Sequence, residues 1–185
     1  MTVAGLLLAA GAGTRMGGPK ALVRADDGEP WLVRGVRALI DGGCSPVTVV
    51  LGAGAEDALP LLDGTAATAV VAGDWADGMS ASLKAGLAAA TGTDADAVLV
   101  TLVDLPDVGA DVVRRLLDPP PGPGALRRAT YDGQPGHPVV IGREHWAAVT
   151  GRTAGDAGAR TYLAEHGAEP VDCSDLATGR DVDTA

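Results

Sequence analysis

Unbroken apolar runs that alternate with helix-like segments constrain the fold of this 185-residue chain more than any other feature. Residues 3–8, 46–51 and 97–103 are almost entirely apolar. Residues 30–40 carry apolar side chains at helical spacing, and residues 80–90 are rich in alanine and leucine. Strands that are apolar along their whole length are typical of parallel sheets covered by helices on both faces. The alternation therefore predicts an α/β fold with a mostly parallel sheet.

The remaining segments continue this pattern. A short strand is expected at 68–71 and helices at 110–117, 144–150 and 156–166, with strands at 125–131, 138–141 and 170–173. The proline- and glycine-rich stretch 119–124 is expected to be an irregular loop, too short to link domains. Residues 1–185 are therefore expected to form a single domain.

A glycine-rich segment, residues 8–20, follows the first of the apolar runs. Glycine permits φ > 0 and a close approach of backbone N–H groups to an anion, and Arg15 and Lys20 add positive charge. A dinucleotide fingerprint is excluded because the spacing from Gly11 to Gly17 is one residue too long, and a P-loop because no Gly-Lys-Ser/Thr is present. The segment predicts a phosphate-binding loop of another kind, with a glycine-rich surface turn as the alternative.

Asp104 directly follows the apolar run 97–103. Parallel α/β sheets bind ligands beyond the carboxyl ends of their strands, so Asp104 and the 8–20 segment are expected on the same rim. A carboxylate opposite a phosphate-binding loop suits Mg²⁺, which prefers oxygen ligands, and the alternative is an aspartate that begins a turn. Asp181 and Asp183 share one side of the chain if this stretch is extended, and the alternative there is a solvated acidic tail.

Four further polar residues have two interpretations each. Ser80 and Ser82 stand near the expected start of a helix, where they either cap it or contact a base or ribose. His137 is either a hydrogen-bonding group of an acceptor site or a structural histidine. Arg160 either binds an anionic substrate or pairs with Asp156 at i,i+4.

Composition narrows the possible partners. A net charge of −10 argues against nucleic acid or an anionic membrane, because such binding needs a basic surface. Cys44 and Cys173 have neither disulfide-framework nor zinc-site spacing, so both are expected to be reduced. The first residues lack the pattern of a signal peptide, and no apolar run approaches the ~20 residues of a membrane span. We therefore expect a cytoplasmic protein.

Six motifs, in order along nearly the whole chain, resemble those of the MobA-like NTP transferase family. They are residues 8–20, 78–83, 104–106, 136–138, 155–160 and 181–184. Within this family, the Leu-Ala-Ala-Gly form of the first motif and the Gly-Met-Ser-x-Ser-Leu form of the second resemble the molybdenum cofactor cytidylyltransferases more than the guanylyltransferases.

The resemblance implies a three-layer α/β/α Rossmann-like nucleotidyltransferase fold and Mg²⁺-dependent transfer of a nucleoside monophosphate from an NTP to a phosphorylated acceptor, with release of pyrophosphate. CTP is the favoured nucleotide and molybdopterin the favoured acceptor, with transient docking to a molybdoenzyme or its chaperone. Arg15, Lys20 and Asp104 would be catalytic, and Asp104 and Asp183 would bind the metal. The nucleotide-site residues that the resemblance implies are Leu8, Ala9, Ala10, Gly11, Gly13, Arg15, Lys20, Asp74, Ser80, Ser82 and Asp104.

One departure from the family and several alternatives stay open. Relatives commonly have Asn-Pro before the tryptophan at this point, whereas this chain has Gly73 and Asp74 before Trp75, so a base or ribose contact is either lost or supplied by Asp74. Transfer from GTP and transfer to a sugar phosphate are alternatives within the same fold. A nucleotide-binding accessory protein without turnover is an alternative of another class.

Overall fold

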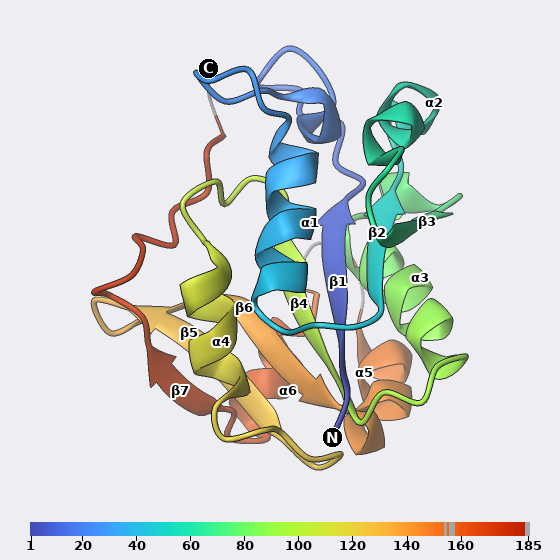
Figure 1. Cartoon of the computed structure of the whole chain (residues 1–185). Helices are drawn as coiled ribbons and strands as arrows, with labels where there is room; N and C mark the ends of the chain where they lie inside the picture. Colours follow the sequence, from blue (N-terminus) through green and yellow to red (C-terminus); the bar gives the residue numbers. More distant parts are fainter. Residues whose placement is uncertain (154, 156–157, 184–185) are drawn as a thin grey trace.

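A seven-stranded sheet forms the centre of the computed structural model, which describes residues 1–153, 155 and 158–183 (Figure 1). The strand order is β3-β2-β1-β4-β6-β5-β7. The strands are β1 (Val3–Ala9), β2 (Val47–Leu51), β3 (Ala67–Val71), β4 (Ala97–Leu102), β5 (Leu126–Tyr131), β6 (Gln134–Gly142) and β7 (Glu169–Asp172). Within the described residues β6 runs antiparallel to β4 and β5, and the other pairings are parallel. The expected mostly parallel sheet is confirmed.

Helices cover both faces of this sheet (Figure 1). On one face lie α1 (Trp31–Asp41) and α4 (Ala110–Leu117). On the other lie α3 (Met79–Thr91), α5 (Trp146–Arg152) and α6 (Arg160–Glu165). This arrangement confirms the three-layer α/β/α fold. None of the helices in the described part of the chain is both long and apolar enough to cross a membrane.

Strand β1 is held between two hydrophobic cores. The Leu7 side chain belongs to the core under α1 and α4, and Leu6 and Leu8 belong to the core under α3, α5 and α6. Leu6 and Leu7 are fully buried, and burying a leucine side chain contributes about 1.5–3 kcal/mol. Because β1 is anchored on both faces, the loop that follows it begins from a fixed point.

Glycines let two helices approach β1 closely. A Cβ atom at Gly35 of α1 would lie 3.0 Å from Cδ1 of Leu7, and one at Gly86 of α3 would lie 3.1 Å from Cδ1 of Leu6. These distances leave little room for a side chain. The close packing of α1 and α3 against β1 therefore depends on glycine at the contact points. The chain contains 27 glycines.

The expected elements correspond to observed ones, with bounds that differ by a few residues. The largest differences are at β6, which begins at Gln134 rather than at 138, and at α6, which begins at Arg160 rather than at 156. The part of the expected helix 156–166 that covers 156 and 157 lies outside the described residues. The sequence does not predict the shortest elements, because they span too few residues to show a period: α2 (Ala55–Ala58) and the 3₁₀ turns Lys20–Leu22, Leu59–Leu62, Trp75–Asp77 and Arg143–His145.

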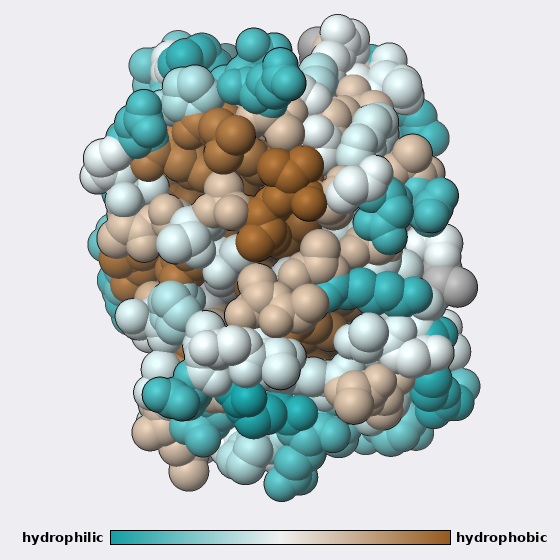
Figure 2. Space-filling model, turned by 90° about the vertical axis from the view of Figure 1, so that its right-hand side faces the viewer, coloured by the Kyte–Doolittle hydropathy of each residue, from teal (hydrophilic) through white to brown (hydrophobic). Residues whose placement is uncertain are grey.

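One edge of the sheet carries exposed apolar side chains. Val71 at the end of β3 is 55% exposed and Leu59 is 42% exposed. Both border a shallow depression beside α2. Figure 2 shows the side of the molecule that includes this edge, where hydrophobic patches lie between hydrophilic residues. The 8–20 segment does not border this depression and lies at the carboxyl end of β1.

Candidate active site

The 8–20 segment folds back on itself directly after β1. Gly13 has φ +57°, and a Cβ atom there would lie 2.0 Å from the carbonyl oxygen of Gly18, so only glycine fits. The carbonyl of Gly13 accepts hydrogen bonds from the backbone N–H groups of Met16 and Gly18. These hydrogen bonds close the loop, and Lys20 is the first residue of the 3₁₀ turn that follows it.

Lys20 connects this loop to two segments that are distant in sequence, the one that follows β4 and the one that follows β7. Its Nζ donates to Oδ2 of Asp104 at 2.5 Å and to Oδ1 of Asp183 at 2.6 Å. Burial alone would lower the pKa of Lys20, but the hydrogen bonds and charges of the two carboxylates outweigh it and raise that pKa. The hydrogen bond and charge of Lys20 lower the pKa of Asp183. Arg15 adds a looser ion pair, 3.6 Å from Asp183. The expected meeting of the 8–20 segment with Asp104 on one rim is confirmed.

Three carboxylates converge beside Lys20. Asp104, Asp181 and Asp183 each offer an oxygen, and these oxygens lie within 4.8 Å of one another. Asp104 is buried, and its Oδ1 has no hydrogen-bond partner among the described residues. The backbone N–H of Val182 donates to the carbonyl of Asp104 at 3.0 Å and so holds the C-terminal segment in place. An all-oxygen, carboxylate-rich set with an unpartnered buried oxygen fits a hard divalent cation such as Mg²⁺ or Mn²⁺.

A cavity of about 340 Å³ opens beside this cluster. Seven of the residues expected at the nucleotide site line it together: Leu8, Ala9, Ala10, Gly11, Lys20, Ser82 and Asp104. Gly13 and Arg15 border an adjoining depression that also contains Lys20 and Asp183. Trp75 lines the main cavity as well, although sequence reasoning did not assign it a role. Its place before the Gly-Met-Ser motif was the signal that could have found it.

Two expected nucleotide-site residues line neither this cavity nor the adjoining depression. Asp74 is exposed at the start of the short turn Trp75–Asp77 and does not line the cavity. Ser80 is 2% exposed, and its hydroxyl has no partner among the described residues. Ser80 does not cap α3 either, because the N-cap residue is Gly78, whose φ of +103° makes the turn into the helix. The capping interpretation of Ser80 is therefore wrong.

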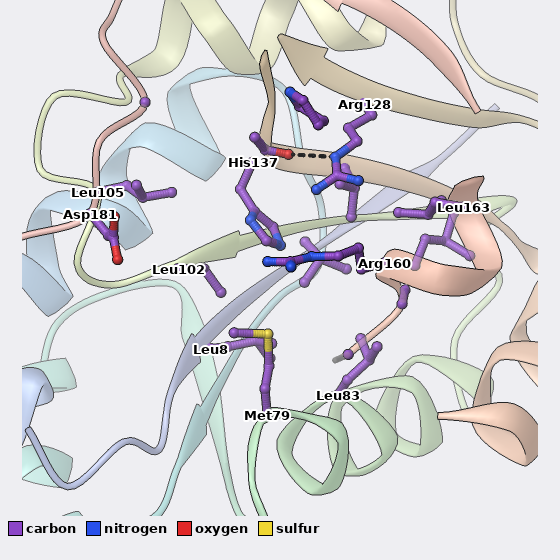
Figure 3. Close-up of a pocket in the computed structure, with 18 residues that line it drawn as sticks. Leu8, Met79, Leu83, Leu102, Leu105, Arg128, His137, Arg160, Leu163 and Asp181 are labelled. Atoms are coloured by element: carbon purple, nitrogen blue, oxygen red, sulfur yellow. Dashed lines mark hydrogen bonds between the residues drawn. The ribbon is translucent and has the colours of Figure 1, made fainter. Parts of the chain in front are cut away.

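A second cavity, of about 260 Å³, adjoins the first (Figure 3). Leu8, Met79 and Leu102 border both cavities. His137 of β6 and Arg160 of α6 both line this cavity. Because β6 runs antiparallel to β4, the first residues of β6 lie beyond the carboxyl end of β4, which places His137 there. Asp156, the partner of Arg160 in the alternative interpretation, lies outside the described residues.

Arg128 of β5 also lines the second cavity, and no motif in the sequence marked it. Its Nε donates to the carbonyl of Gly136 at 3.1 Å. Burial and the neighbouring charge of Arg160 lower the pKa of Arg128. Burial, with the charges of Arg128 and Arg160, lowers the pKa of His137 to about 4, so this imidazole is neutral at pH 7.

The MobA-like NTP transferase domain matches residues 5–171 of the chain. The chain belongs to the MobA-like NTP transferase family. A curated protein similar to this chain is the nicotine blue oxidoreductase of Paenarthrobacter nicotinovorans. The two sequences are 40% identical over 98% of this chain and 92% of the relative. The family supports nucleotidyl transfer as the class of reaction.

Solved structures resemble this MobA-like transferase along its whole length. Rv0371c from Mycobacterium tuberculosis H37Rv superimposes with a TM-score of 0.82 at 26% identity, covering 100% of this chain and 94% of that one. A structure of the same mycobacterial protein in complex with manganese gives a TM-score of 0.77 at 24% identity, covering 93% and 88%. The three-layer fold described above is therefore shared with Rv0371c.

Proposed function

We propose that this MobA-like protein transfers CMP from CTP to a phosphorylated acceptor, with molybdopterin as the favoured acceptor, and acts as one domain formed by residues 1–185. The observation that carries the proposal is the cluster of Lys20, Asp104 and Asp183 at the edge of the nucleotide-sized cavity. A divalent cation and a triphosphate need this combination of acidic and basic groups at one point.

Each part of the cluster has a proposed role. Leu8 to Gly11 and Ser82 form walls against the nucleoside, and Lys20 and Arg15 hold the phosphate oxygens. Asp104 and Asp183, joined by Asp181, would hold Mg²⁺, which when bound neutralises charge on the phosphates and the leaving pyrophosphate. We leave Asp74 and Ser80 out of this set because neither lines the cavity.

The proposed reaction is a single in-line displacement. An oxygen of the acceptor phosphate forms a bond to the α-phosphorus of the nucleotide, and the bond to the β-phosphate oxygen breaks, which releases pyrophosphate. The residues contribute by fixing the two reactants at adjacent cavities and by offsetting negative charge with Lys20 and Arg15.

The choice of CTP and molybdopterin is supported by the Leu-Ala-Ala-Gly and Gly-Met-Ser-x-Ser-Leu segments, which resemble those of molybdenum cofactor cytidylyltransferases. The manganese complex of Rv0371c supports a divalent cation as the cofactor. Transient docking to a molybdoenzyme or its chaperone belongs to the same proposal, because a finished cofactor must be delivered to its apoenzyme. Transfer from GTP, or to a sugar phosphate, remains the alternative within the same fold.

A second candidate function follows from the 40% identical relative, whose name describes an oxidoreductase of nicotine blue. The cavity of about 260 Å³ beside the nucleotide cavity has apolar walls formed in part by Leu102, Leu105 and Leu163, which suit a heteroaromatic substrate. In this candidate the nucleotide cavity would hold a reduced nicotinamide dinucleotide as the hydride donor.

Two parallel assays separate these candidates. The first measures pyrophosphate release from each NTP with Mg²⁺ or Mn²⁺, with and without molybdopterin, and the second measures oxidation of NADH and NADPH in the presence of nicotine blue. We expect acceptor-dependent release that is selective for CTP and falls by about 10² or more in Asp104→Asn. Asp94→Asn, at an exposed position, is the matched control. Selectivity for GTP would overturn the choice of nucleotide. Dye reduction without pyrophosphate release would overturn nucleotidyl transfer, and binding of NTP without either reaction would indicate an accessory protein.

A further inference from the structure

The second cavity concentrates positive charge in a chain whose net charge is −10. Arg128 and Arg160 approach it from different elements, β5 and α6, with the imidazole of His137 between them (Figure 3). The bond from Nε of Arg128 to Gly136 fixes this side chain and leaves its terminal nitrogens without a hydrogen-bond acceptor among the described residues. The guanidinium group is thus held in place but not neutralised.

Neither Arg128 nor Arg160 forms a salt bridge with a carboxylate among the described residues. The groups that perturb Arg128 are its own burial and Arg160, and those that perturb His137 are burial and the two arginines. Asp181 borders the same cavity, but its carboxylate belongs to the cluster with Asp104 and Asp183. Two like charges that are placed together repel one another, and this repulsion is relieved when an anion binds between them.

The walls around these groups are apolar. Leu8, Leu102, Leu105 and Leu163, with Met79, enclose the space that the arginines face (Figure 3). A cavity that combines a few convergent polar groups with apolar walls is typical of sites for small organic ligands. The neutral His137 adds a hydrogen-bonding group without adding charge.

We propose that the second cavity binds the acceptor through an anionic group, distinct from the phosphate that reacts, which Arg128 and Arg160 hold while an apolar ring system lies against the leucines. The reacting phosphate would lie at the end of the cavity marked by Asp181, next to the carboxylate cluster. The acceptor is thus a ring compound with two separate anionic groups. This inference rests on the proposed nucleotidyl transfer, which needs an acceptor site adjoining the nucleotide cavity.

The test uses a probe that cannot act as a phosphate acceptor. Binding of 1-naphthalenesulfonate and of its neutral isostere, 1-naphthalenesulfonamide, is measured by titration calorimetry on the full chain without nucleotide and again with Mg²⁺ and CTP. We expect the sulfonate to bind more tightly than the sulfonamide, and its affinity to fall by about tenfold or more in Arg128→Gln and in Arg160→Gln. Arg128→Lys should restore part of the loss.

Two controls make the result specific. Arg114→Gln removes an exposed arginine of α4 and matches the change in net charge. Lys20→Met removes the cation of the nucleotide site. Without nucleotide, both variants should bind the sulfonate with unchanged affinity, and circular dichroism checks that each variant is folded. Loss of binding in Lys20→Met but not in Arg128→Gln, or equal affinity for the two probes, would overturn the inference. Because no turnover is measured, this outcome is independent of whether the nucleotidyl transfer proposal holds.

Discussion

At the scale of single residues, Lys20 is central to the site. Its ammonium group lies within hydrogen-bond distance of Asp104 and Asp183, two of the three carboxylates that fit a divalent cation. The positive charge of Lys20 opposes the binding of a divalent cation to the same carboxylates, although Oδ1 of Asp104 has no hydrogen-bond partner among the described residues. A metal ion therefore competes electrostatically with Lys20, and a lysine displaced from these oxygens becomes available to phosphate.

Replacement of Lys20 by methionine should have opposite effects on two ligands. Without nucleotide, Mn²⁺ should bind about tenfold more tightly, because hydrogen bonds to charged groups worth about 1.5–3 kcal/mol each no longer compete. The affinity for CTP should fall, because a phosphate contact is lost. Mn²⁺ binding is followed by electron paramagnetic resonance and CTP binding by calorimetry. Lys84→Met, which changes the other lysine of the chain, is the control. Weaker Mn²⁺ binding in Lys20→Met would contradict this competition.

His137 should make the stability of the fold depend on pH. Its pKa is about 4 in the folded chain and ~6.5 when unfolded, so between these values the unfolded state binds the extra proton. Stability should therefore fall as pH decreases from 6.5 towards 4, with a contribution of roughly 2 kcal/mol at pH 5. In urea unfolding at pH 7.5 and pH 5, this loss should be absent from His137→Gln. An equal difference between the two proteins at both pH values would disprove the assignment.

At the scale of elements, the contact between α1 and α4 depends on a glycine. A Cβ atom at Gly42, which ends α1, would lie 2.3 Å from Cγ1 of Val113 in α4. Val113 is buried, so a methyl group at Gly42 would have to displace packed neighbours. Gly92 ends α3 with the same φ of −76°, but a Cβ atom there would meet only the carbonyl oxygen of Ala89, at 3.5 Å.

This pair of glycines gives a direct comparison. Gly42→Ala should lower the free energy of unfolding by about 1–3 kcal/mol, the usual cost of overpacking a core. Gly92→Ala should change it by less than about 1 kcal/mol, because the added methyl group has room. Chemical denaturation of both variants measures the effect. Equal stabilities would show that α4 can shift to accept the methyl group.

The sequence predicted the elements better than their connections. Unbroken apolar runs were sufficient for β1 and β4, because both strands are buried on both faces, and the sequence also predicted α4 with its observed bounds. The apolar pattern was insufficient for the four-residue helix α2, and it did not reveal that β6 runs antiparallel to its neighbours. Lys20 and Asp104 could be predicted because both follow strand ends. Arg128 could not, because an arginine within a strand carries no local signal that it faces a cavity.

At the scale of the whole molecule, the two ends of the chain complete one site. The first strand leads into the loop with Lys20, and the segment after β7 returns to bring Asp181 and Asp183 beside it. This returning segment is tied down at Thr178, whose backbone N–H and hydroxyl both donate to Oδ2 of Asp107, at 2.7 and 2.6 Å.

Loosening this tie should weaken metal binding from a distance. Asp107 is not among the three carboxylates that converge beside Lys20. Asp107→Ala should nevertheless reduce Mn²⁺ affinity by roughly threefold to tenfold, because a lost hydrogen bond costs about 1 kcal/mol. Calorimetry with Mn²⁺ measures the effect. Asp111→Ala, which removes an exposed carboxylate of α4, should leave the affinity as it is. Unchanged binding in Asp107→Ala would mean that the C-terminal segment is held by other contacts.

The reversed direction of β6 has a consequence for how the two cavities are built. It separates the sheet into β3-β2-β1-β4, whose ends carry the loop with Lys20 and the carboxylate Asp104, and β6-β5-β7, whose strands supply Arg128 and His137. If the proposed acceptor site is correct, substitutions at Arg128 or His137 would change which compound is recognised and leave the loop with Lys20 and the carboxylate Asp104 in place. Only the segment after β7, which carries Asp181 and Asp183, contributes to both sites.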